Sequence, residues 1–238
     1  EIYTLSLHDA LPISENHRAF VTIAIMLIGW LPSLAHDFEV EGIFYSKTSD
    51  NTVAVTYKGD YTYSYDNEYA GDVVIPSSVD YNGITYSVTN IGNNAFSGCS
   101  SLTSIVIPNS VTGIGYGAFY CCDNLTSIEI PNSVTSIGQS AFKNCTNLTD
   151  VVIGNSVTSI GNDAFADCSS LTSIVVDPGN TKYDSRNGCN AIIETDSNTL
   201  IFGCGNTIIP NSVTSIGDWA FADCSSLTNI QIPNSVTS

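Results

Sequence analysis

The sequence predicts a solenoid of stacked repeats of 23 residues, with a parallel β-sheet on one face and short helical turns or irregular segments on the other. Two observations predict this fold class. Columns of one side-chain type return every 23 residues over four units: Cys99, Cys122, Cys145 and Cys168; Phe96, Phe119, Phe142 and Phe165; Ile91, Ile114, Ile137 and Ile160. In addition, one unit of this size cannot bury its own apolar side chains, whereas stacked units share a continuous core.

A single unit contains the signals of a strand and of a return path. Residues 102–107 alternate apolar and polar side chains, which predicts a short strand with one buried face. Pro108 ends this strand, because proline has no N–H to donate to a sheet. Val111 and Ile114 turn inward on the return path, and residues 118–122 fit one inward-facing helical turn. We therefore expect neighbouring strands to stack about 4.8 Å apart in a continuous parallel sheet.

The repeated pattern L-x-x-I-x-I-P-x-x-V-x-x-I-G-x-x-A-F-x-x-C resembles the BspA-like class of leucine-rich repeats, and the resemblance covers roughly residues 73 to 238. It implies a leucine-rich-repeat solenoid. Members of that family are typically secreted or displayed on the cell surface, and several are described as adhesins for host matrix proteins or other cells. The pattern is specific for the fold and much less specific for the ligand, because repeat scaffolds are reused with different faces.

The first 35 residues predict export rather than structure. Residues 1–14 resemble translated sequencing-adapter DNA, and we assign them no structural meaning. Residues 15–35 contain an apolar run that is shorter than the roughly 20 residues of a membrane-spanning helix. The run ends in the small-x-small sequence of residues 33–35, which is typical of a signal-peptide cleavage site. A buried core helix is the alternative. A signal peptide predicts a secreted or cell-surface protein with no transmembrane span in the mature chain.

Two segments depart from the repeat period. Residues 36–90 have the alternation of strands, and we expect a β-rich N-terminal cap before the repeats of residues 91–238, because arrays need an atypical end unit. The alternative is an aromatic binding surface built from Tyr61, Tyr63, Tyr65 and Tyr69. An irregular island at residues 177–207 contains a predicted hairpin, and it either replaces one repeat or carries function. The array stops inside a repeat, so we expect a truncated C-terminus.

Charge and histidine content exclude several classes of function. Lys and Arg number 6 against 23 for Asp and Glu, and the resulting net charge of −17 repels phosphate backbones, so nucleic acid is not an expected partner. The histidines are His8, His17 and His36, and the rest of the chain lacks the side chain most used for acid–base catalysis near neutral pH. We therefore expect no enzyme, no catalytic residues, no cofactor and no metal site.

Acidic residues leave two weaker alternatives open. A glycosidase needs only a pair of carboxylates, and nothing in the sequence pairs the candidates, which are Glu129, Asp150 and Glu194. Calcium between turns would use Asp163 with Asp167, or Asp218 with Asp223, which we interpret instead as solvated surface acids.

The cysteines follow the repeat more than they follow any disulfide pattern. Five of them share one position beside phenylalanine, where we expect reduced, buried thiols that pack as small apolar groups: Cys99, Cys122, Cys145, Cys168 and Cys224. Cys189 and Cys204 stand outside this column and are the candidate disulfide. Cys121 faces the other way and is a candidate exposed thiol.

The outward positions of the repeated strand form three columns along the sheet. They are Thr103, Thr126, Thr149, Thr172 and Thr228; Ser104, Ser127, Asp150, Ser173 and Asn229; and Val106, Glu129, Val152, Val175 and Gln231. This candidate binding face is mildly polar with an exposed valine column, although threonine and valine also simply suit strands.

A binding function is the first hypothesis that these features favour. The partner would be a protein or another cell-surface macromolecule, and the acidic charge would steer a basic patch of that partner toward the face. The rival hypothesis is a targeting or spacer module of a larger protein, whose catalytic or anchoring domain lies beyond residue 238.

Overall fold

The computed structural model describes residues 36–59, 68–222 and 224–238. The predicted leader and signal peptide, together with Tyr61, Tyr63 and Tyr65, lie outside these residues. The first strands are β1 (Phe38–Val40), β2 (Ile43–Lys47), β3 (Thr52–Thr56), β4 (Gly71–Val74), β5 (Ser78–Tyr81) and β6 (Ile84–Ile91). The repeats contain β7 (Leu102–Val106), β8 (Gly113–Ile114), β9 (Ser127–Ile130), β10 (Ser136–Ile137), β11 (Asp150–Ile153), β12 (Ser159–Ile160) and β13 (Ser173–Val176).

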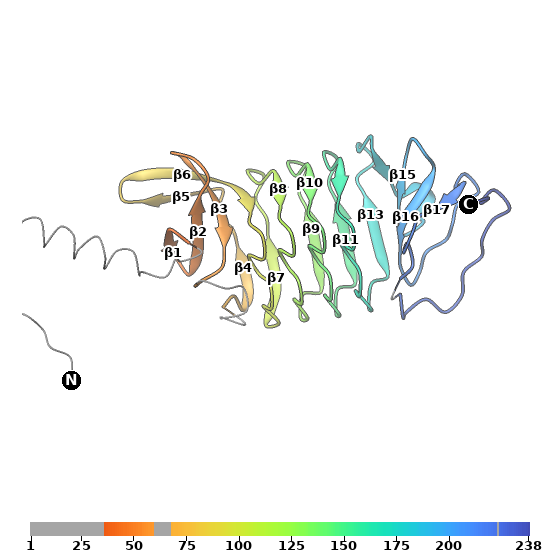
Figure 1. Ribbon diagram of the computed structural model, residues 1–238, viewed down its shortest axis with the longest axis horizontal. Coiled ribbons are helices and arrows are strands. Elements are labelled where there is room, and N and C mark those ends of the chain that lie inside the picture. Colours follow the sequence, from red (N-terminus) through yellow and green to blue (C-terminus); the bar gives the residue numbers. More distant parts are fainter. Residues whose placement is uncertain (1–35, 60–67, 223) are drawn as a thin grey trace, which may run out of the picture. The chain divides into compact units, whose positions relative to one another are not determined.

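Each regular repeat contributes one strand to each of two parallel ladders (Figure 1). The segment with the Leu-x-x-Ile pattern forms the first ladder, in which β4 pairs with β7 and β11 pairs with β9 and β13. The Ser-Ile segment of the return path forms the second ladder, β6-β8-β10-β12. The leucine-rich-repeat fold and its parallel sheet are thus confirmed. The first ladder is not continuous, however, because hydrogen-bonded pairing is interrupted between β7 and β9.

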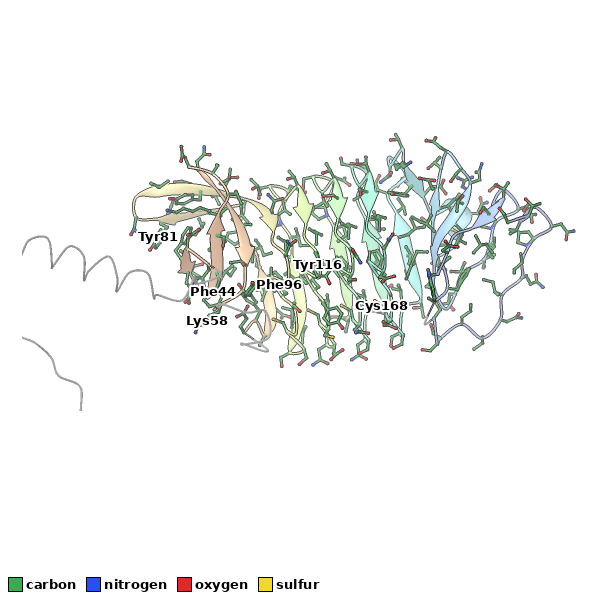
Figure 2. All side chains as sticks on the ribbon, in the orientation of Figure 1. Phe44, Lys58, Tyr81, Phe96, Tyr116 and Cys168 are labelled. Carbon is green, nitrogen blue, oxygen red and sulfur yellow. The ribbon has the colours of Figure 1, made fainter. Side chains whose placement is uncertain are left out.

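The phenylalanine and cysteine columns form the middle of the core. Rings of successive repeats stack almost in parallel, with centroids 4.9 Å apart for Phe119 and Phe142 and 5.3 Å apart for Phe142 and Phe165. Phe96 at the start of this column and Cys168 near its end are both buried (Figure 2). The segments that carry them are turns rather than helices; the one helix in the described part of the chain is the short 3-10 element Arg186–Gly188.

The residues before the regular repeats are rich in strands. β1, β2 and β3 pair antiparallel, β3 joins β6 in parallel, and β5 and β6 form a hairpin. β4 pairs in parallel with β7, so the first ladder begins within residues 36–90. Tyr69 does not lie on an aromatic surface: its ring is buried, and its hydroxyl donates to the Thr56 carbonyl at 2.6 Å and accepts the Phe44 N–H at 3.1 Å.

The island forms a small sheet between the fourth repeat and the last ones. Its strands are β14 (Tyr183–Asp184), β15 (Ala191–Glu194) and β16 (Thr199–Gly203), which pairs with β17 (Ser215–Ile216) of the next repeat. The predicted hairpin is the antiparallel pair β15–β16. Cys204 precedes Pro210 by six residues, as Leu102 precedes Pro108, and its buried side chain takes the place of the repeat's leucine.

The candidate disulfide between Cys189 and Cys204 is absent from the structure, in which both residues are buried free thiols. The Cys204 thiol donates to the carbonyl of Asn190 at 3.1 Å, and the Cys189 thiol donates to the carbonyl of Ala191 at 3.7 Å. The two thiols thus bind different carbonyls. Cys204 packs in the core as a residue of its own repeat.

Candidate binding surface on the parallel strands

The alternation of the first ladder places the side chain of one column on the outer face, and in most strands this residue is a valine. Leu102, Ile105 and Ile107 are buried, whereas Val106 between them is 55% exposed. Val152 and Val175 occupy the same position in β11 and β13, are opposite one another in register, and are also exposed. An exposed aliphatic side chain on successive strands creates a line of apolar surface, which single scattered residues do not.

This line is longer than the sequence pattern predicted. Val74 in β4 is in register with Val106 and is 65% exposed. Ile208 precedes Pro210 by two residues, as Val106 precedes Pro108, and is 71% exposed. We call these five exposed side chains the aliphatic strip: Val74, Val106, Val152, Val175 and Ile208.

Glu129 lies within the aliphatic strip, opposite Val152 in the adjacent strand. It is exposed and adds negative charge to a surface that is otherwise aliphatic at this column. Thr228, Asn229 and Gln231 of the last repeat are exposed as well, but they lie in a segment without strand structure. A hollow of about 690 Å³ lined by Ile208 and Gln231 separates them from the preceding repeat. The structure thus brings together the column members of the regular repeats but not those of the last one.

The two polar columns beside the strip are held by hydrogen bonds of their own. Thr103 and Ser104 donate to one oxygen of Asp72 in β4, at 2.9 and 2.6 Å, and these bonds lower the pKa of the Asp72 carboxyl. Farther along, the Thr149 hydroxyl lies 2.6 Å from the Asp150 carboxylate and 3.0 Å from the Thr126 carbonyl, and its single hydrogen can serve either acceptor. Hydroxyls that are already bonded in this way hold the outer face in one arrangement before any partner arrives.

Most of the carboxylates considered for other chemistry are either exposed on the outer face of the first ladder or paired with a lysine. Glu129 and Asp150 lie on the adjacent strands β9 and β11, two positions apart in register, whereas Glu194 lies on the island hairpin and pairs with Lys182 at 2.8 Å. Asp163 and Asp167 both contact the Lys143 ammonium, at 3.8 and 3.7 Å, so a lysine occupies the place where a calcium ion would bind. Asp223 lies outside the described residues.

The described residues hold no group of three or more His, Cys, Asp or Glu side chains arranged as metal ligands. Within the same residues, no helix is long and apolar enough to cross a membrane.

The stacked strands, the buried phenylalanine column and the repeat period are the features on which family membership depends. A family model of the BspA-type leucine-rich-repeat region matches residues 60–189 and 202–238 in six copies. The chain belongs to this family. The match skips part of the island, where β15 and β16 interrupt the repeat.

Solved structures of bacterial leucine-rich-repeat proteins have the same fold as this BspA-type chain. A leucine-rich-repeat protein from Bacteroides ovatus is 30% identical, with a TM-score of 0.55, over 84% of this chain and 54% of that one. A leucine-rich-repeat protein from Eubacterium ventriosum is 22% identical, with a TM-score of 0.54, over 83% of this chain and 59% of that one. The chain thus spans little more than half the length of either protein. No functionally curated protein matches it.

Proposed function

We propose that this chain is a secreted or cell-surface protein, without enzymatic activity, that binds a protein of the host matrix or of another cell through the aliphatic strip. The observation that carries the proposal is the strip itself: four exposed valines at one strand position of β4, β7, β11 and β13, with exposed Ile208 at the equivalent sequence position after the island. Strands held in a stacked array form a rigid, extended surface, and such surfaces suit long partner segments that make many small contacts.

The electrostatics of the chain support the same proposal. A net charge of −17 favours approach of a basic patch on the partner, and Glu129 places a carboxylate within the strip. Long-range attraction of this kind raises the association rate and weakens as salt screens it. The strip lacks aromatic and arginine anchors, so we expect moderate affinity that depends on several repeats together.

The test is saturable binding of the purified protein to a panel of extracellular-matrix proteins and intact cells. Changing Val106, Val152 and Val175 together to Asp should abolish specific binding, and changing them to Thr should weaken it while keeping β-branched strand residues. The matched control changes Thr112, Thr135 and Thr158 to Asp, which adds the same charge at exposed positions of the return path. Equal loss in both sets would show that charge alone, not the strip, governs binding.

The rival hypothesis, a targeting or spacer module of a longer protein, predicts a different outcome. The chain would then show no saturable ligand on any matrix protein or cell, and the wild type and the strip variants would behave alike. Binding that is saturable and lost only in the strip variants would exclude the spacer hypothesis.

A further inference from the structure

Backbone hydrogen bonds join successive repeats along the turns that carry the phenylalanines. Between the second and third repeats, the N–H groups of Gly117, Phe119 and Cys121 donate to carbonyls of the next repeat at 2.7–3.0 Å. The preceding and following junctions repeat this arrangement at the equivalent positions. Three donors on alternate residues therefore close each regular junction.

The series stops at the fourth repeat. Asp163 and Phe165 hold the positions of Gly117 and Phe119, yet in the described part of the chain their N–H groups have no backbone acceptor. The island explains the interruption. The N–H of Gly203 in β16 donates to the carbonyl of Ala220 in the next repeat at 2.8 Å, whereas at a regular junction the phenylalanine N–H donates to the equivalent alanine carbonyl. The ring of Phe202 meets Phe165 at 54°, whereas rings at regular junctions are within 6° of parallel.

A cleft of about 700 Å³ opens at this interrupted junction. Turn residues of the fourth repeat, the island sheet and residues 217–222 line it, and none of its lining residues belongs to the aliphatic strip. Strands β15 and β16, which contribute lining residues, and β17, which directly precedes Gly217, are labelled in Figure 1. Unpaired backbone N–H groups at the edge of a cleft are binding groups for a partner's carbonyls, since such donors are costly to leave unsatisfied once water is displaced.

Negative charge and an exposed tryptophan complete the cleft. Asp163, Glu194 and Asp218 line it, without any lysine or arginine among the lining residues. Asp163 and Glu194 pair with Lys143 and Lys182, at 3.8 and 2.8 Å, whereas no ion pair to Asp218 is present within the described residues. The indole of Trp219 lines the same cleft and is 81% exposed.

Trp219 also has a left-handed backbone conformation, which is unfavourable for a bulky side chain. The equivalent residues of other repeats are Asn94, Gly117, Ser140 and Asp163, all with φ between 54° and 56°, and Trp219 has φ 62°. A bulky side chain is an outlier in this left-handed region, where glycine, asparagine and aspartate are tolerated. Strained and exposed side chains of this kind gather at binding sites.

We propose that this cleft binds an extended, basic peptide segment of a partner protein. Carbonyls at alternate residues of the segment accept the N–H groups of Asp163 and Phe165, so that the segment continues the interrupted series. A lysine or arginine of the segment lies between the Asp218 carboxylate and the face of the Trp219 indole, which attracts cations. The site is separate from the strip and goes beyond the proposed function.

Fluorescence anisotropy of a fluorescein-labelled acetyl-(Lys-Ser)4-amide peptide tests the cleft, with the (Glu-Ser)4 and (Gln-Ser)4 peptides as comparisons. We expect saturable binding of the lysine peptide alone. Trp219→Asn and Asp218→Asn should each weaken it by about tenfold. The control Tyr116→Ala removes another exposed aromatic residue, at a regular junction, and should leave the affinity unchanged. Equal affinity of wild type and Trp219→Asn, or no binding, would overturn the proposal.

Amide hydrogen exchange distinguishes peptide binding in the cleft from non-specific attraction of the peptide to the acidic surface. On peptide binding, exchange at Asp163 and Phe165 should slow, whereas Gly117 and Phe119, already bonded across their junction, should not change. Binding without protection at Asp163 and Phe165 would overturn the proposal in favour of non-specific charge attraction. The variant with Val106, Val152 and Val175 changed to Asp should still bind the peptide, which distinguishes failure of the strip from failure of the cleft.

Discussion

The thiol of Cys145 donates a hydrogen bond of 3.1 Å to the carbonyl of Phe119 in the preceding repeat. Cys122 and Cys168 make the same contact with Phe96 and Phe142. The cysteine column thus does more than fill space, because each thiol adds a second hydrogen bond to a carbonyl that already accepts the N–H of the cysteine in its own repeat. Burial raises the pKa of the Cys145 thiol well above its usual range, so the reactive thiolate is scarce.

We predict that the thiols differ in reactivity while the protein is folded. Cys121, which is partly exposed, should react with a disulfide reagent such as dithionitrobenzoate, whereas Cys145, which is fully buried, should react only on unfolding. Mass spectrometry of the labelled peptides after a short reaction identifies the modified residues. Labelling of Cys145 as fast as Cys121 under native conditions would contradict the buried thiol column, and a Cys121→Ser variant serves as the control.

Phe142 provides a test of the stacked core. Its ring lies between those of Phe119 and Phe165, with centroids 4.9 and 5.3 Å away, and its side chain is fully buried. Phe142→Ala should lower the free energy of unfolding by about 3–5 kcal/mol, the usual cost of emptying a buried aromatic site. Urea denaturation followed by circular dichroism measures the change. Phe221→Ala, at the partly exposed equivalent position beyond the island, should cost less.

Much of the fold could be predicted because the repeat period exposes the buried columns directly. Ile105 and Phe119 return every 23 residues, and both are buried. The second ladder was missed, because β8 and β10 have two residues each and are too short to show alternation. The phenylalanine segments form turns rather than helices, because a repeat of 23 residues leaves room for only about one turn before the next strand begins.

The candidate site was predicted only where the repeat is uninterrupted. Val106 was found from its period, but Val74 and Ile208 were missed, because the β5–β6 hairpin and the island displace the surrounding pattern. An Ile-Pro pair follows each of the two missed residues, at Ile75 and Ile209, and would have been the signal for both. The cleft at Trp219 has no such signal, since it results from the spacing between two repeats.

Substitutions at Trp219 measure how much its left-handed backbone conformation lowers the stability of the fold. Asparagine tolerates left-handed φ and alanine does not, so Trp219→Asn should be more stable than Trp219→Ala by about 0.5–1 kcal/mol. Because the indole is 81% exposed, little packing is lost in either variant. Thermal unfolding followed by circular dichroism provides the comparison. Equal stability of the two variants would show that the wild-type conformation at this position is not strained.

Glu68 predicts a pH dependence that is specific to the region before the repeats. Burial raises its carboxyl pKa to about 7, against the opposing effects of the Lys58 N–H, which donates to it at 2.8 Å, and of the Lys58 ammonium. Because the folded pKa exceeds the unfolded value of about 4.3, the folded state binds more protons between these values. The stability contributed by Glu68 is therefore complete at low pH and is lost as pH rises through about 7.

Glu68→Gln tests this contribution, since it removes the titration and keeps a side chain of similar shape. The difference in free energy of unfolding between Glu68→Gln and wild type should grow in favour of the variant as pH rises from about 4.3 toward neutrality. Comparing each variant with the wild type at the same pH cancels the general repulsion of a chain with net charge −17. Glu39→Gln removes one charge from an exposed position of β1 and controls for that repulsion. If both variants show the same pH profile, the carboxyl of Glu68 is not the group that titrates, and its burial beside Lys58 has no effect on stability.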